Sequence, residues 1–177
     1  MTTQNLPRGT SSAQKLAVLL ATGLGLGLLT PAPGTVGSLI WGMPLAWAIG
    51  QIPGLAGQIL AIVLINLAGI PLATIAGQAL GGEKDNQSIV WDEIATVPLV
   101  YLFVPLTNWR VAVAGYALHR LLDITKPPPA RQLERLPDGL GVMADDWMAG
   151  IYAGALMAGI AWLDRAAESG LLSAAGG

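Results

Sequence analysis

Asp92 and Glu93 are adjacent carboxylates inside an otherwise apolar stretch, IVWDEI at residues 89–94. Further acids stand beside apolar segments, namely Asp123, Asp145 and Asp146. The chain has no cysteine and a single histidine, so this set offers almost only oxygen ligands. Such ligands suit Mg²⁺ rather than zinc. The five carboxylates are therefore candidate metal ligands and candidate catalytic groups.

Each of these acids also has a purely structural explanation. Acidic side chains are favoured at the start of a helix because they interact well with the helix dipole, so both acidic pairs can be helix caps. Asp123 can simply end a helix, and His119, one helical turn earlier, is expected to hydrogen-bond to it. Asp85 is expected in a solvated loop. For any single acid, capping and function explain the sequence equally well.

The rest of the composition indicates a membrane protein. The 177 residues have a mean hydropathy of +0.58 and are 11% charged, whereas an ordinary soluble domain is about 25% charged. No charged residue or histidine occurs from Leu16 to Gly82, and residues 94–109 and 147–163 are also uncharged. Such runs cannot cover a surface in water, so we expect several helices in a lipid bilayer. The net charge of −2 predicts no nucleic-acid partner.

The pattern of apolar runs predicts an all-α fold, a small multi-spanning bundle of membrane helices. The expected helical segments are 16–29, 39–49, 58–80, 89–106, 111–122 and 144–163. The TPAPGTVGS stretch at residues 30–38 is expected to break the helices, because it combines prolines with glycines. We expect residues 1–15 to be a loose polar N-terminus rather than a cleaved signal, 16–165 to form one membrane domain, and 166–177 to be a short tail.

The lengths of these segments predict that the acids meet at one membrane face. A hairpin with helical limbs at residues 94–107 and 111–123 has limbs of nearly equal length, about 20 Å each. Its two acidic ends then lie level, and the turns near Pro53 and Asn108 lie at the opposite face. Six of the eleven acids collect on the first face: Asp85, Asp92, Glu93, Asp123, Asp145 and Asp146.

Clustered carboxylates repel one another unless a cation lies among them, which again indicates Mg²⁺. Five of the nine basic residues share this face: Lys84, Arg120, Lys126, Arg131 and Arg135. A cation held by carboxylates and surrounded by Arg and Lys suits an anionic phosphate. The TPAPGT turn adds hydroxyls and N–H groups that can hold phosphate oxygens. We therefore expect phosphate chemistry in which an activated water attacks phosphorus.

Two other classes of membrane protein also use acidic residues. A small ion or proton transporter places acids in apolar helices, but near the middle of the membrane, whereas these lie at helix ends. A phosphatidyltransferase of the CDP-alcohol type uses acids and a metal at the same surface. It carries a DGxxAR signature, and the single Asp-Gly of this chain, at Asp138, is followed by LGV.

Four stretches, in this order, resemble the phosphatidylglycerophosphatase A family: PAPGTVGS, IVWDE, RLLDITKPPP and GLGVMADDWMAG. They extend from about residue 31 to residue 150. The resemblance implies a multi-pass enzyme of the bacterial inner membrane that uses Mg²⁺ to hydrolyse phosphatidylglycerophosphate to phosphatidylglycerol and phosphate. It also implies an active site facing the cytoplasm, and the excess of basic residues on the acidic face favours that side.

The resemblance further implies which residues form the site. The residues that match the family motifs are Gly34, Thr35, Gly37, Ser38, Asp85, Asp92, Glu93, Arg120, Asp123, Lys126, Pro127, Gly141, Asp145 and Asp146. The residues predicted to be catalytic and to hold the metal are Asp92, Glu93, Asp123, Asp145 and Asp146. Phosphate-binding roles are predicted for Thr35, Ser38, Arg120 and Lys126. Additional site residues are Asp85, Gly34 and Gly141.

The chain departs from the family pattern at three places, Thr96, Glu134-Arg135 and Asp138-Gly139. None of these departures removes a predicted metal-binding carboxylate. They leave the preference among related substrates open.

Overall fold

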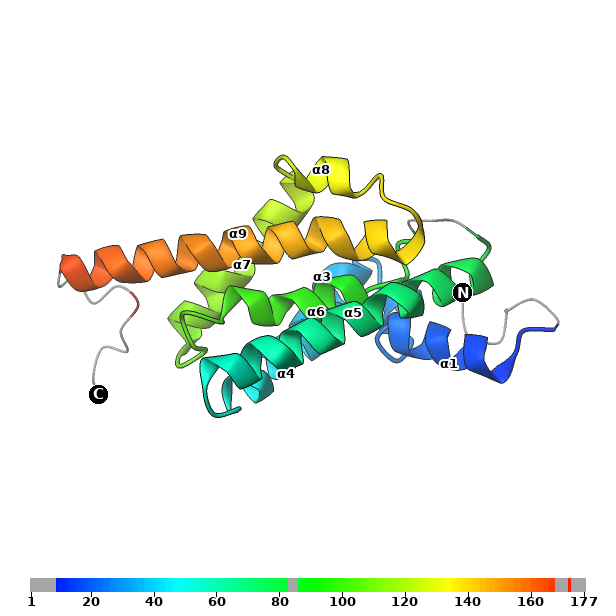
Figure 1. The fold of residues 1–177 in the computed structure, drawn as a ribbon, viewed down its shortest axis with the longest axis horizontal. Coiled ribbons are helices and arrows are strands. Elements are labelled where there is room, and N and C mark those ends of the chain that lie inside the picture. The colour runs from blue at the N-terminus through cyan, green and yellow to red at the C-terminus, as the bar shows by residue number, and fades with distance from the viewer. Residues whose placement is uncertain (1–8, 83–85, 168–171, 173–177) are drawn as a thin grey trace.

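The structure is a computed structural model that describes residues 9–82, 86–167 and 172. Within these residues the regular structure is entirely helical, which confirms the predicted all-α fold (Figure 1). The helices are α1 (Ser12–Ala21), α2 (Leu26–Leu29), α3 (Pro33–Gly37), α4 (Met43–Gly50), α5 (Leu55–Ala79), α6 (Trp91–Val100), α7 (Trp109–Thr125), α8 (Ala130–Leu133) and α9 (Asp138–Ala166), with a π-helical turn at Ser38–Gly42 between α3 and α4.

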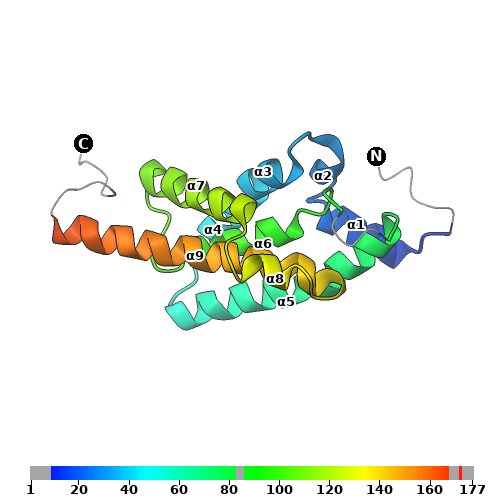
Figure 2. The ribbon, with the colours of Figure 1, turned by 90° about the horizontal axis from the view of Figure 1, so that it is seen from above.

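Helix α6 lies at the centre of the molecule. It packs against α4, α5 and α9, and less extensively against α3 and α7 (Figures 1 and 2). Its start is fixed by a backbone hydrogen bond from Val90 to the carbonyl oxygen of Ala21, at the end of α1 (2.8 Å). The first turn of α6, which carries Asp92 and Glu93, is therefore held among other helices rather than presented on an open surface.

Small residues let α9 approach α6 closely. A Cβ atom at Gly154 would lie 2.7 Å from the carbonyl oxygen of Leu99, and one at Gly150 would lie 3.0 Å from that of Thr96. Two glycines four residues apart are a common device for close helix packing in membranes. This contact brings the beginning of α9, with Asp145 and Asp146, beside the beginning of α6.

The buried side chain of Asn66 joins three helices. Its amide nitrogen donates to the carbonyl oxygens of Ile62 (2.8 Å) and Ala95 (2.9 Å), and its oxygen accepts a hydrogen bond from the indole of Trp147 (2.9 Å). These bonds link α5, α6 and α9. Because Trp147 follows the second acidic pair directly, Asn66 helps to fix the rotation of α9 that turns those acids inward.

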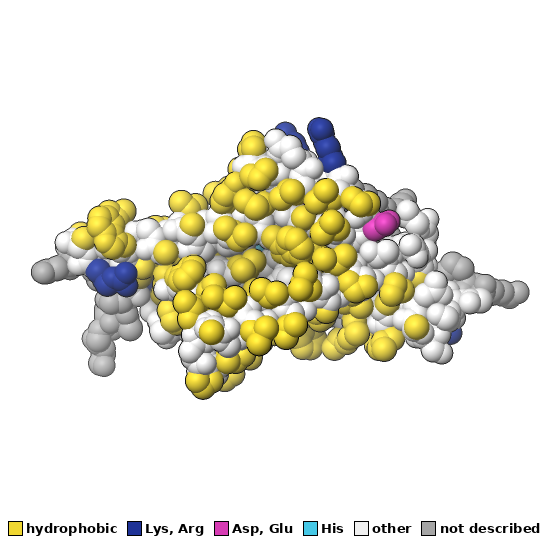
Figure 3. Space-filling view, viewed as in Figure 1, with side chains coloured by type: hydrophobic (Ala, Val, Ile, Leu, Met, Phe, Trp, Pro, Cys, Tyr) yellow, Lys and Arg dark blue, Asp and Glu magenta, His cyan; other side chains and the backbone are white. Residues whose placement is uncertain are grey.

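The outer surface is strongly apolar. Two helices, α5 and α9, are long and apolar enough to cross a membrane. Leu60, Leu64 and Leu67 of α5 are each more than half exposed, and hydrophobic side chains gather over the middle of the face seen in Figure 3. Exposed apolar surface of this extent is typical of a protein that contacts lipid. By length and composition, the described helices thus support two crossings.

Several predicted segments differ from the observed helices. Helix α6 ends at Val100, so residues 94–107 are not one helical limb; α6 contains Pro98, and the chain turns at Tyr101. At ten residues, α6 rises about 15 Å, too little to cross a bilayer. The predicted break at residues 30–38 is wrong in part, because Pro33 begins the helix α3. Proline is tolerated at the first helical position, since the N–H group that it lacks would have no partner within the helix.

The third difference concerns the last helix. It begins at Asp138, six residues before the predicted start at residue 144, so Asp145 and Asp146 lie beyond its first turn. The helix-cap explanation is therefore wrong for this pair. At the other end of the chain, α1 begins at Ser12, inside the segment expected to be loose.

Candidate active site

A polar pocket of about 690 Å³ opens between the ends of several helices. Its walls come from α3, α6, α7, α8 and α9 and from the chain before α6. The residues that line it are Ala32, Pro33, Gly34, Thr35, Gln87, Ile89, Asp92, Glu93, Arg120, Asp123, Lys126, Arg131, Glu134, Arg135, Gly141, Val142, Asp145 and Asp146. The structure thus brings the five predicted catalytic acids into one pocket, although more than fifty positions separate the first from the last.

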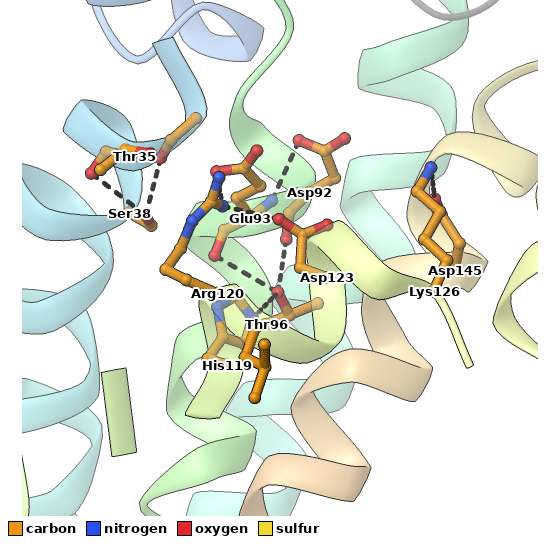
Figure 4. A network of polar contacts seen from close by, with 12 residues as sticks. Thr35, Ser38, Asp92, Glu93, Thr96, His119, Arg120, Asp123, Lys126 and Asp145 are labelled. Atoms are coloured by element: carbon orange, nitrogen blue, oxygen red, sulfur yellow. Dashed lines mark hydrogen bonds and ion pairs between the residues drawn. The ribbon is translucent and has the colours of Figure 1, made fainter. Parts of the chain in front are cut away.

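Arg120 of α7 connects two of these acids. Its guanidinium Nη1 lies 2.6 Å from Glu93 Oε2 and 2.7 Å from Asp123 Oδ2, and all three side chains are mostly buried (Figure 4). Asp123 follows Arg120 by three residues on α7, and the geometry of that helix alone makes the two side chains neighbours. The bond to Glu93 forms only because α6 and α7 pack together.

Lys126 forms the second ionic contact. Its Nζ lies 2.7 Å from Asp145 Oδ2 and 3.5 Å from Glu134 Oε2. Lys126 ends α7 in the left-handed conformation, with φ at 44°. That conformation is costly for a residue other than glycine and occurs mostly at functional or tightly constrained positions. Of the basic residues that line the pocket, Arg120 and Lys126 are thus each paired with carboxylates (Figure 4).

Asp145 and Asp146 are the most buried of the acids, at 7% and 3% exposed. Asp145 Oδ1 and Asp146 Oδ2 have no hydrogen-bond partner among the described residues. A buried carboxylate oxygen without a partner is costly, since that atom has lost its hydrogen bonds to water and accepts none from the protein. These two atoms are thus the strongest indication that the pocket receives a ligand or a cation.

The negative charge in the pocket exceeds what Arg120 and Lys126 neutralise. Burial raises the pKa of Glu93 to about 7, even though Arg120 lowers it. Burial, and then the neighbouring Glu93, raise the pKa of Asp92 well above its ordinary value. Carboxyl groups whose ionised form is disfavoured in this way gain most from a nearby positive charge.

These residues fit Mg²⁺ by their chemistry. The donors are oxygens, and two of them are buried and unpartnered. Across the described residues, however, no three acidic or histidine side chains converge closely enough to form a ready-made metal site. The pocket therefore has the donor set of a magnesium site without the closed geometry of one.

One wall of the pocket is formed by residues 32–35, where the chain enters the short helix α3; we call this segment the α3 loop. A Cβ atom at Gly34 would overlap the carboxylate of Glu93, so this position has room for glycine alone while Glu93 stays where it is. Thr35 lines the pocket next to it. Tyr116 of α7 holds the loop in place, because its hydroxyl donates to the carbonyl oxygen of Thr35 (2.7 Å).

Not every predicted site residue reaches the pocket. Ser38 is fully buried, its hydroxyl donates to the carbonyl oxygen of Gly34 (2.7 Å), and it does not line the pocket. Its position supports the α3 loop from behind rather than facing a phosphate. Gly141 does line the pocket. Asp85 and Lys84 lie outside the described residues.

His119 does not make the predicted hydrogen bond to Asp123. Its buried Nε2 instead lies 3.2 Å from the hydroxyl oxygen of Thr96, which donates to the carbonyl oxygen of Asp92 (2.9 Å) (Figure 4). The reason is that α6 packs directly against this side of α7. Thr96, one of the departures from the family pattern, thus links His119 to the turn that carries the first acidic pair.

Two supporting residues were absent from the sequence-based prediction. Tyr116 holds the α3 loop, and Tyr152 of α9 donates to the carbonyl oxygen of Pro128 (2.8 Å), beside the loop that carries α8. A signal for Tyr116 was available, since it precedes Arg120 by one helical turn and so shares its face of α7. No such signal exists for Tyr152, whose partner lies 24 residues away.

The chain is similar to proteins with established names. A model of the family described as phosphatidylglycerophosphatase A matches residues 19–161. A phosphatidylglycerophosphatase A of Haemophilus influenzae is 37% identical over 85% of this chain and 92% of its own length. That of Escherichia coli is 32% identical over 78% of this chain and 80% of its own.

A protein of Bacteroides thetaiotaomicron, provisionally named a phosphatidylinositol-3-phosphatase, is 36% identical over 84% of this chain and 95% of its own length. No solved structure matches the chain.

Proposed function

The chain belongs to the phosphatidylglycerophosphatase A family, and from that premise we propose that its pocket hydrolyses the terminal phosphomonoester of phosphatidylglycerophosphate. Family membership makes it a phosphatidylglycerophosphatase, a phosphoric monoester hydrolase of phosphatidylglycerol biosynthesis. The observation that carries the proposal is the gathering of five acids, Arg120 and Lys126 in one pocket. Phosphoryl transfer is catalysed mainly by placing charge around the reacting phosphate, and this set provides charges of both signs.

Mg²⁺ is the cation that we propose for this pocket. Its ligands would come from Asp92, Glu93, Asp123, Asp145 and Asp146. When bound, the ion supplies Lewis acidity toward the phosphoryl group. The unpartnered oxygens of Asp145 and Asp146 support the proposal, because they are buried, accept no hydrogen bond from the described residues and can act as metal ligands.

The protein's own groups have separate tasks in this mechanism. Arg120 and Lys126 attract the phosphomonoester and neutralise part of its charge, while the hydroxyl of Thr35 donates to a phosphate oxygen. One pocket carboxylate accepts a proton from the attacking water as its oxygen bonds to phosphorus. The bond from phosphorus to the glycerol oxygen breaks, and that oxygen takes the proton from the same carboxyl group and leaves as the alcohol of phosphatidylglycerol.

Phosphate release from phosphatidylglycerophosphate by the purified protein tests the proposed function. We expect release with Mg²⁺ and a loss of at least a hundredfold after chelation with EDTA, with recovery when Mg²⁺ is restored. Phosphatidylinositol 3-phosphate is the comparison substrate, because one relative carries a name for that activity. No release with Mg²⁺ from folded protein, or faster release from the inositol lipid, would contradict the proposal.

We also propose that the chain is a multi-spanning bundle in the bacterial inner membrane, with the pocket on the cytoplasmic side. The long apolar helices α5 and α9 support membrane insertion. The α4–α5 turn and the α6–α7 loop lie at one end of the molecule, away from α8 and the start of α9 (Figure 1). The cytoplasmic orientation rests on the family resemblance and on the distribution of basic residues.

Labelling of single engineered cysteines tests this topology, since the chain has no cysteine of its own. Exposed positions Gln132 and Pro137 represent the pocket side, and Pro53 and Thr107 the opposite side. In sealed inside-out vesicles, a membrane-impermeant thiol reagent should label the first two and spare the others. Right-side-out vesicles should give the reverse. Labelling of Gln132→Cys and Thr107→Cys from the same side would disprove the proposed topology.

A further inference from the structure

Two arginines at the mouth of the pocket, Arg131 and Arg135, have no part in the mechanism above. Both line the pocket, and both are exposed. They lie one helical turn apart, and the backbone bond from Glu134 to Ala130 continues the turn between them (3.1 Å). Side chains at this spacing share one side of a helix. Figure 3 shows basic side chains rising above the apolar surface at the top of the molecule, where Figure 1 places α8.

The other cations of the pocket are already engaged. Arg120 is paired with Glu93 and Asp123, and Lys126 with Asp145 and Glu134. Within the part of the chain that the structure describes, neither Arg131 nor Arg135 forms an ion pair. Both arginines line the same pocket, and their guanidinium groups keep a full positive charge that no carboxylate of the described residues pairs with. An anion that enters the pocket supplies such a partner.

The chemistry of the proposed substrate supplies such an anion. Phosphatidylglycerophosphate carries two phosphates, a terminal monoester and a diester that joins the two glycerol units. When the monoester lies against the buried acids and their cations, the diester remains on the side of the acyl chains, toward the mouth. Guanidinium groups match phosphate oxygens in geometry and keep their charge at any physiological pH.

We propose that Arg131 and Arg135 bind the phosphodiester of the substrate and so determine specificity. This inference rests on the proposed function. It predicts that the pocket binds its substrate more tightly than lipids that carry a phosphomonoester alone, such as phosphatidate. Those lipids reach the buried acids but leave both arginines without a partner.

Steady-state kinetics of the double variant Arg131→Gln/Arg135→Gln test the proposal. The assay uses neutral detergent micelles, with phosphatidylglycerophosphate as substrate and phosphatidate as competitor. We expect KM for the substrate to rise at least tenfold, while the inhibition constant of phosphatidate changes less than threefold. Phosphatidate serves as a competitor whether or not the protein cleaves it. The variant Arg131→Lys/Arg135→Lys, which keeps the charge but loses the planar fork, should recover part of the loss.

Arg165→Gln is the matched control, because Arg165 is an exposed arginine near the other end of α9. It should leave both constants at their wild-type values. An unchanged KM in the double variant overturns the inference. So does a parallel rise of KM and the phosphatidate constant, which would assign the arginines to the monoester. A defect seen only in micelles that contain anionic lipid also overturns it, since the arginines then bind the lipid surface.

Failure of the proposed function itself is distinguishable from these outcomes. It appears in the wild-type protein, as no phosphate release from phosphatidylglycerophosphate with Mg²⁺ present.

Discussion

Replacing Asp146 or Asp92 by asparagine should lower the rate of phosphate release at least a hundredfold while the protein stays folded. Each change removes one negative charge from the pocket and almost no volume. Asp146 is 3% exposed with one oxygen unpartnered, so its charge serves the pocket rather than an ion pair of the fold. Loss of a single charge or donor that stabilises a transition state commonly costs about 10²–10³ in rate.

The measurement is kcat/KM for phosphatidylglycerophosphate over a range of Mg²⁺ concentrations. Asp138→Asn is the matched control, since Asp138 lies on the same helix, is exposed and does not line the pocket. It should retain wild-type activity. Near-normal activity of both pocket variants at limiting Mg²⁺ would show that these acids do not bind the metal.

Gly34→Ala should lower kcat by about a hundredfold with little change in thermal stability. The added methyl group would overlap the carboxylate of Glu93, which must then move away from the pocket position that its bond to Arg120 defines. Because only the end of a side chain has to shift, the fold tolerates the change. The chemistry does not, since a displacement of about 1 Å in a catalytic group can cost about 10² in rate.

Gly159→Ala is the control for this prediction. Gly159 lies in α9, and a Cβ atom there would meet nothing within 4 Å. It should behave as the wild type in both activity and melting temperature. If Gly34→Ala retains full activity, Glu93 need not occupy its observed position for catalysis. If Gly34→Ala unfolds the protein, the glycine serves the packing of α3.

Composition and motif spacing suffice to predict a lipid environment and phosphate chemistry. Long runs without charge exclude a water-facing surface, and this holds however the helices pack. Oxygen ligands with basic residues nearby predicted a cation and a phosphate before any contact was known. The position of α5 was also predictable within a few residues. A long apolar run in a membrane forms a helix because its backbone N–H and C=O groups must hydrogen-bond to one another there.

Five of the six acids predicted to share one face line one pocket, although part of the predicted geometry was wrong. Residues 94–107 are not an unbroken helix, and Asp145 and Asp146 do not begin one. The acids still converge, because α9 packs on α6 through Gly150 and Gly154. Helix boundaries were the least predictable feature. Proline can begin a helix or break one, depending on its position, and glycine is favoured just after a helix ends, so a single residue type does not fix the boundary.

Which polar groups meet depends on how the helices pack against one another. Arg120 pairs with Glu93, Lys126 pairs with Asp145, His119 bonds to Thr96 rather than to Asp123, and Ser38 turns behind the α3 loop. The first three contacts join different segments of the chain. Their geometry depends on the rotation of each helix about its axis, which packing against neighbours determines. Spacing along one helix reveals only the neighbours one turn away, and for that reason the bond from Arg120 to Asp123 was predictable from the sequence while the contacts between helices were not.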